Sequence, residues 1–153
     1  MKTTSIKYNP SKLYVMYSLL LIGASILLSS CKKELKASDP LPLIYSNVYI
    51  IGDASPALWN IDAAIKMTVN PANKTQFTWT GPLTAGEIKF ATQKSFSSDF
   101  FVAATASQSV SNNKAQIALS GNPDIKWKLS AAEAGTYQIT VDMNAVTVTF
   151  KKQ

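Results

Sequence analysis

Hydrophobic and polar residues alternate in short stretches along the part of the chain that follows residue 45. A period of two is the pattern of a β-strand with one buried face. Glycine, proline and asparagine separate the stretches at about the spacing of hairpins. The pattern predicts strands at residues 48–51, 65–69, 77–80, 87–92, 125–129, 137–142 and 146–150. The last two predict a closing hairpin.

Short strands with turn signals and almost no helical periodicity predict an all-β fold, an antiparallel β-sandwich spanning residues 45–153. Two stretches, residues 53–64 and 93–114, show no strand pattern. We expect both to form long loops, which in a compact domain are usually functional or disordered.

The N-terminal part of the chain has the pattern of a targeting segment. A basic stretch, residues 1–12, precedes an uncharged apolar run at residues 13–28, as in a secretory signal. Leu-Ser-Ser-Cys at residues 28–31 matches the bacterial lipobox, and Cys31 is the only cysteine. The pattern predicts a lipoprotein signal peptide at residues 1–30 and a lipid on Cys31. The alternative is a transmembrane anchor with an incidental cysteine, for which the apolar run is somewhat short.

Residues 31–44 are first charged and then punctuated by proline, which predicts a lipidated tether. The short charged start resembles the export signals of Bacteroidota surface lipoproteins, although those are usually more acidic. We therefore expect an outer-membrane lipoprotein at the cell surface, with the periplasmic face as the open alternative. The partner at this end is the membrane, reached through the lipid.

Composition removes several function classes. With 46% hydrophobic and 16% charged residues, the chain is not of the disordered type. The 15 basic residues are all lysines and histidine is absent, which excludes Ser-His-Asp catalysis and histidine-based zinc sites. A single cysteine excludes an internal disulfide. Loss of three signal-peptide lysines lowers the formal charge from +6 to +3, and with no arginine we expect no nucleic-acid partner.

The acidic residues do not form a recognisable catalytic motif. A glycosidase needs two carboxyl groups placed across the sugar, and no such pair can be assigned from the sequence. Ile51-Gly52-Asp53-Ala54 lacks the glycine pattern of a nucleotide-binding loop. We expect no enzymatic activity, no metal and no cofactor.

The three tryptophans differ in their settings. Trp59 lies in a polar loop and is the best candidate for an exposed ring that stacks on a sugar. Trp79 lies on the apolar face of a strand and is expected in the core. Trp127 is ambiguous, because its strand neighbours on the same face are apolar while lysines flank it; we take it as a second platform or as its support. Lys89 and Lys126 are expected to hydrogen-bond sugar hydroxyls. Alternation points Lys126 away from Trp127, so both reach one flat site only at a bulge or an edge.

Four blocks of the sequence, taken in order, resemble a known family. They are residues 48–60 (VYIIGDASPALWN), 77–90 (FTWTGPLTAGEIKF), 124–129 (DIKWKL) and 134–150, the last with a closing hairpin pattern. Together they are similar to the starch-binding domains of SusE/SusF-type outer-membrane lipoproteins of Bacteroidota. The chain departs from that pattern at Leu58, where the family usually has glycine, and at Ser55, where it often has threonine.

The resemblance implies an immunoglobulin-like sandwich that binds polysaccharide, starch or another α-glucan, without catalysis. It also implies a place beside an outer-membrane glycan transporter complex. Members usually carry two or more such domains, whereas this sequence has room for one. That difference and Leu58 keep an alternative open: a structural or protein-interaction lipoprotein subunit with no sugar site.

Overall fold

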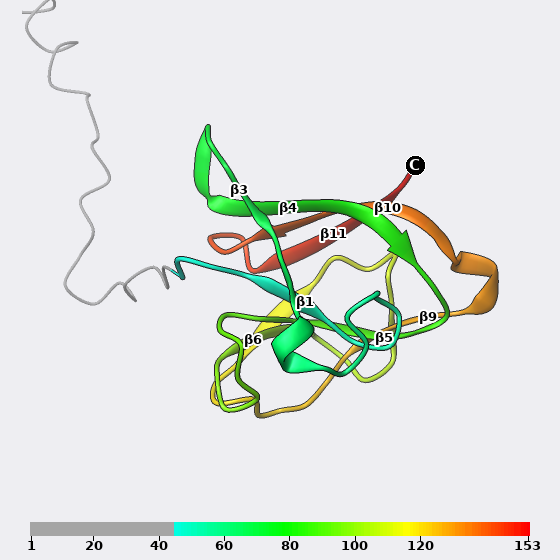
Figure 1. Cartoon of the computed structure of the whole chain (residues 1–153), viewed down its shortest axis with the longest axis horizontal. Coiled ribbons are helices and arrows are strands. Elements are labelled where there is room, and N and C mark those ends of the chain that lie inside the picture. The colour runs from blue at the N-terminus through cyan, green and yellow to red at the C-terminus, as the bar shows by residue number, and fades with distance from the viewer. Residues whose placement is uncertain (1–44) are drawn as a thin grey trace, which may run out of the picture. The chain divides into compact units, whose positions relative to one another are not determined.

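The computed structural model describes residues 45–153 (Figure 1). The predicted signal peptide, the lipid at Cys31 and the tether lie outside these residues. No helix among the described residues is both long and apolar enough to cross a membrane. The fold is an all-β sandwich, which confirms the predicted class. Figure 1 shows one layer with β3, β4, β10 and β11 and another with β1, β5, β6 and β9.

Eleven short strands and two 3-10 turns make up the domain. In chain order they are β1 (Tyr49–Ile51), η1 (Ile61–Ala63), β2 (Ile65–Lys66), β3 (Thr68–Asn70), β4 (Asn73–Leu83), β5 (Gly86–Ala91), β6 (Phe100–Ala103), β7 (Gln108–Ser109), β8 (Ala115–Ala118), β9 (Trp127–Leu129), η2 (Ala131–Glu133), β10 (Gly135–Asp142) and β11 (Thr147–Lys152).

Pairing is antiparallel except between β7 and β9. The larger sheet has the order β2-β1-β5-β6-β8, with β9 on β5 and β7 on β9. The smaller sheet has the order β11-β10-β4-β3. β10 and β11 form the predicted closing hairpin, in register from Tyr137 opposite Lys152 to Asp142 opposite Thr147.

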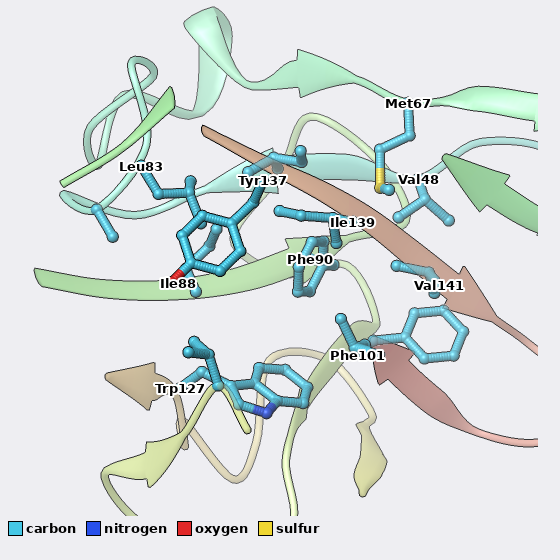
Figure 2. Packing of buried hydrophobic residues seen from close by; sticks show 14 of the residues in the cluster. Val48, Met67, Leu83, Ile88, Phe90, Phe101, Trp127, Tyr137, Ile139 and Val141 are labelled. Atoms are coloured by element: carbon cyan, nitrogen blue, oxygen red, sulfur yellow. The ribbon is translucent and has the colours of Figure 1, made fainter. Parts of the chain in front are cut away.

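The main core lies between the two sheets, and Figure 2 shows its packing. Ile88, Phe90 and Trp127 come from the larger sheet and are fully buried. Tyr137 and Ile139 reach them from β10 of the smaller sheet. Strands of this kind bury every second side chain, so the predicted alternation is what fills this core.

A second apolar cluster, here called the outer cluster, lies on the opposite face of the larger sheet. It consists of Ile51, Ala64, Ala91, Phe100, Val102 and Ala118, with Tyr49, Trp59, Ile61 and Ile125 partly buried against it. Loops cover this face of the larger sheet, so β1, β5 and β6 are buried on both faces and the outer face does not contact water. Those loops carry the candidate site.

Three predicted elements differ from the structure. The expected single strand at residues 65–69 is divided at Met67 into β2 and β3, which pair in different sheets. The strand expected at residues 77–80 is longer at both ends, because β4 runs from Asn73 to Leu83. It continues through Gly81 and Pro82 because β10 pairs with it there, while β3 pairs only as far as Thr78. Beyond β3, this part of β4 is an edge of the sheet, where proline is tolerated.

The third difference is within residues 93–114, where a long loop was expected. The structure places two strands there, β6 and the two-residue β7, and all four residues of β6 are buried. β6 lies between β5 and β8 inside the larger sheet. A strand buried on both faces reads as a continuous apolar run and shows no alternation, so the period-two pattern could not reveal it.

Candidate functional site

Trp59 is carried by a loop that the backbone closes on itself. The Gly52 amide donates to the Leu58 carbonyl at 2.8 Å, and the Leu58 amide donates to the Ser55 carbonyl at 3.0 Å. Asn60 then caps η1 by accepting from the Asp62 amide at 3.1 Å. This loop places Trp59 on the outer cluster with part of the side chain left in solvent. Trp59 is thus a half-buried ring on a fixed loop.

Lys89 projects from β5 toward the same outer face, opposite Ile88 and Phe90, as alternation predicts. Its side chain is only 6% exposed. The ammonium donates to Asp124 Oδ1 at 2.7 Å and lies 4.1 Å from the centroid of the Phe100 ring. Lys89 is therefore a buried, paired cation, and little of it is open to a ligand.

Lys126 approaches from the segment before β9. Its ammonium donates to Asp124 Oδ2 at 2.9 Å and stands 5.6 Å from the centroid of the Trp59 ring. The Lys89 ammonium stands 5.9 Å from the same ring. The structure thus brings Trp59, Lys89 and Lys126 together, with Asp124 as their common partner.

Asp124 was not predicted as part of a site, yet it joins the two lysines. Partial burial raises the pKa of Asp124, but hydrogen bonds and charge from Lys89 and Lys126 outweigh it and hold the pKa below its ordinary value. The carboxylate is therefore ionised at neutral pH. Sequence offered one weak signal: Asp124 stands two residues before Lys126, within reach of its ammonium.

Phe96 is an exposed aromatic ring near Trp59's neighbour Lys89, and the sequence analysis did not select it as a site residue. It is 47% exposed, and the Lys89 ammonium lies 5.9 Å from its centroid. Its loop is held to η1 by a hydrogen bond from the Lys94 ammonium to the Asp62 carbonyl. A large apolar side chain in a serine-rich segment was the available signal, the same one that selected Trp59.

Trp127 corrects an expectation. Its relative exposure is 0%, its ring packs against Phe90 and Phe150, and its indole N–H donates to the Asn112 carbonyl at 3.1 Å. Figure 2 shows it inside the core. A buried indole cannot stack on a sugar, so Trp127 is not a platform in this structure. Trp79 is partly buried against the main core.

No group of three or more Asp, Glu, His or Cys side chains suited to a metal ion occurs in the part of the chain that the structure describes. The arrangement instead offers two partly open aromatic rings, one exposed carboxylate and one partly exposed ammonium. Rings of this kind stack on the C–H face of a pyranose, and the charged groups can hydrogen-bond its hydroxyls.

The profile of the SusF/SusE starch-specific CBM family (carbohydrate-binding modules) matches residues 47–149, about two-thirds of the chain. The chain belongs to this family. Membership in the SusF/SusE family supports carbohydrate binding by the sandwich, and it agrees with the resemblance seen in the sequence. No curated protein and no solved structure matches the chain.

Within this SusF/SusE module, the loop before Trp59 has an unusual residue in a strained conformation. Leu58 has φ 53°, in the left-handed region that favours glycine, and is 59% exposed. The loop thus keeps a backbone conformation that glycine adopts without strain, although its residue there is leucine. The substitution at Leu58 therefore does not prevent the loop from closing and presenting Trp59.

Proposed function

We propose that this protein is a non-catalytic, lipid-anchored carbohydrate-binding module of the cell envelope, which captures α-glucan beside a glycan-uptake system. The observation that carries the proposal is the half-buried Trp59 ring, fixed on its loop and bordered by the Lys89 and Lys126 ammoniums at 5.9 and 5.6 Å. Family membership supports starch as the ligand class.

In this proposal a glucose unit stacks on Trp59, and Phe96 provides a second apolar contact. Lys126 donates to a hydroxyl with an N–H that its ion pair leaves free, since an ammonium has three donors. Lys89 acts mainly through Asp124, because its own ammonium is buried. A shallow surface with few contacts gives weak binding, with Kd between about 1 μM and 1 mM.

Affinity electrophoresis in gels that contain amylopectin tests the proposal. We expect the wild-type protein to be retarded and Trp59→Ala to migrate as in a gel without polysaccharide. Trp79→Ala is the matched control, since it removes the same side chain from β4 of the other sheet, and it should remain retarded. Retardation of Trp59→Ala equal to wild type would remove Trp59 from the site.

Absence of retardation of the wild-type protein on every polysaccharide tried would instead favour the alternative, an accessory lipoprotein subunit without a sugar site. Release of reducing ends from polysaccharide over hours would contradict the non-catalytic role.

The anchoring part of the proposal rests on the lipobox pattern at residues 28–31. Cys31→Ser should move the protein from the membrane fraction to the soluble fraction and abolish incorporation of labelled palmitate. Protease treatment of intact cells then decides between the outer surface, which we expect, and the periplasmic face.

A further inference from the structure

A polar hollow opens at the end of the larger sheet where β1 begins and β5 ends. Its volume is about 480 Å³, and it is lined by Tyr45, Ser46, Asn47, Thr92 and Gln93. Residues 45–47 lead into β1, and residues 92–93 follow β5, its antiparallel neighbour. No residue assigned above to the Trp59 site lines this polar hollow. The volume is that of an ordinary small-molecule site.

The walls of the polar hollow are held by hydrogen bonds that converge on Asp99. The Thr92 amide and hydroxyl donate to the Asp99 carbonyl at 2.9 and 2.8 Å. The Tyr45 hydroxyl donates to Asp99 Oδ2 at 3.1 Å, and the Ser120 amide donates to Oδ1 at 2.9 Å. The Tyr45 ring also packs edge-on against Phe101, with 5.8 Å between the centroids. Both walls are thus in place before a ligand arrives, which lowers the entropy cost of binding.

The side chains that remain available in the hollow are uncharged. Asn47 and Gln93 carry carboxamides and Ser46 carries a hydroxyl, and within residues 45–153 none of the three makes a side-chain hydrogen bond. A carboxamide both donates and accepts, so it can pair with a hydroxyl in either sense. No charged side chain lines the hollow, so an anion or a cation would gain no counter-charge there. This chemistry favours a neutral polyhydroxyl ligand over an ion.

The segment after Thr92 connects the polar hollow to the Trp59 surface. Its turns are closed by the Ser95 amide, which donates to the Gln93 carbonyl at 2.8 Å, and by the Ser98 amide, which donates to the Ser95 carbonyl at 3.2 Å. Phe96 follows Gln93 by three residues, so their backbones lie within about 11 Å of each other. Because Phe96 borders the Trp59 site, a polysaccharide can contact both places at once.

We propose that the polar hollow is a second, weaker carbohydrate site: Asn47 and Gln93 hydrogen-bond the hydroxyls of one neutral sugar unit, and a chain already held at Trp59 occupies the hollow as well. The inference rests on the proposed function for its ligand class. A site with a Kd of about 1 mM, met at an effective concentration of about 2 mM, raises the apparent affinity for a long chain about threefold. A short oligosaccharide binds the two sites independently.

Nitrogen–proton NMR during titration with maltotriose separates the two sites. The side-chain amide signals of Asn47 and Gln93 report on the hollow, and the indole signal of Trp59 reports on the other site. We expect the amide signals to shift with a Kd of about 1 mM or weaker, and to do so equally in Trp59→Ala. The signal of the buried Trp127 indole checks that the variant keeps its fold.

The outcomes distinguish this inference from the proposed function. Amide signals that stay in place while Trp59 shifts, or that no longer shift in a folded Trp59→Ala, overturn the second site and leave the proposed function standing. Amide signals that shift while Trp59 stays in place support the hollow and contradict the proposed role of Trp59. If neither group of signals moves, both proposals fail.

Asn47→Ala/Gln93→Ala tests the joint use of the two sites by long chains. Its Kd for amylopectin in affinity gels should rise about threefold, while its Kd for maltotriose at Trp59 should equal that of wild type. Gln138→Ala/Asn144→Ala is the matched control, because it removes two exposed amides from the β10–β11 hairpin, and it should leave both values unchanged. Retardation of Asn47→Ala/Gln93→Ala equal to wild type would overturn the joint use.

Discussion

The ion pair between Lys89 and Asp124 is strongly asymmetric, and the two ways of breaking it should differ in cost. Lys89 is 6% exposed and Asp124 is 57% exposed. Asp124→Asn keeps the side-chain volume but leaves a buried ammonium with a neutral amide and the Phe100 ring at 4.1 Å. Lys89→Met removes the buried charge and leaves a carboxylate that water and Lys126 still satisfy.

Removing one partner of a fully buried ion pair costs about 3–5 kcal/mol. Here the amide oxygen still accepts one hydrogen bond and the ring attracts the ammonium, so Asp124→Asn should lower the free energy of unfolding by about 2–3 kcal/mol. Methionine fills the same space and contacts aromatic rings well, so Lys89→Met should cost about 1 kcal/mol or less. The double variant should be more stable than Asp124→Asn alone.

Urea unfolding followed by tryptophan fluorescence at pH 7 gives the free energies of unfolding of the wild-type protein, of the two single variants and of the double variant. The reasoning is refuted if Lys89→Met costs as much as Asp124→Asn, or if the double variant loses the sum of both. Either result would mean that the Lys89 ammonium is solvated by water when Asp124 is replaced, and that it is not a buried charge that depends on this carboxylate. Lys128→Met is the control, since Lys128 is an exposed lysine of β9 and its substitution should change stability by less than about 0.5 kcal/mol.

Three further predictions concern the rest of the domain. Leu58→Gly should raise the free energy of unfolding by about 0.5–1 kcal/mol, because Leu58 has φ 53°; a lower free energy in urea would contradict this. Trp127→Ala should lower it by about 3–5 kcal/mol, since the ring is fully buried; a loss under 1 kcal/mol would place the ring outside the core. Burial and the Asp99 acceptor raise the pKa of Tyr45 from 10.0 to about 12, so the stability that Tyr45 contributes below pH 10 is lost as the pH approaches 12. The unfolding free energy of wild type relative to Tyr45→Phe should fall by on the order of 2 kcal/mol over that interval, and a constant difference would show that Tyr45 titrates normally.

Much of the fold could be predicted because most strands have one face in the main core. Alternation at β10 and β11 places Ile139 and Val148 inside and their neighbours outside, and the structure agrees. Alternation does not identify a strand whose two faces are both buried, or a segment that passes from one sheet to the other. β6 is buried on both faces, and Met67 marks a change of sheet that leaves the alternation of its segment intact.

The candidate site could be predicted only in part. Trp59 stood out because a large ring in a polar loop needs an explanation. Asp124 and Phe96 did not stand out in the sequence. They reach the site because two loops fold over the same sheet face, and no local sequence pattern predicts that contact. For Trp127 two roles were expected, a second platform or its support, and the platform role was wrong because the ring is fully buried. The flanking lysines were given weight, although lysines on the outward face of a strand say nothing about the residue between them.

The central claim is that a sugar meets Trp59 and neither of the other two tryptophans. Two-dimensional nitrogen–proton NMR of the protein resolves one signal for each of the three indole N–H groups during titration with maltoheptaose. The account predicts that the Trp59 signal moves progressively to saturation, whereas the Trp79 signal and the buried Trp127 signal, whose N–H donates to the Asn112 carbonyl, stay in place. A titration in which Trp59 is unmoved while either of the others shifts would contradict it.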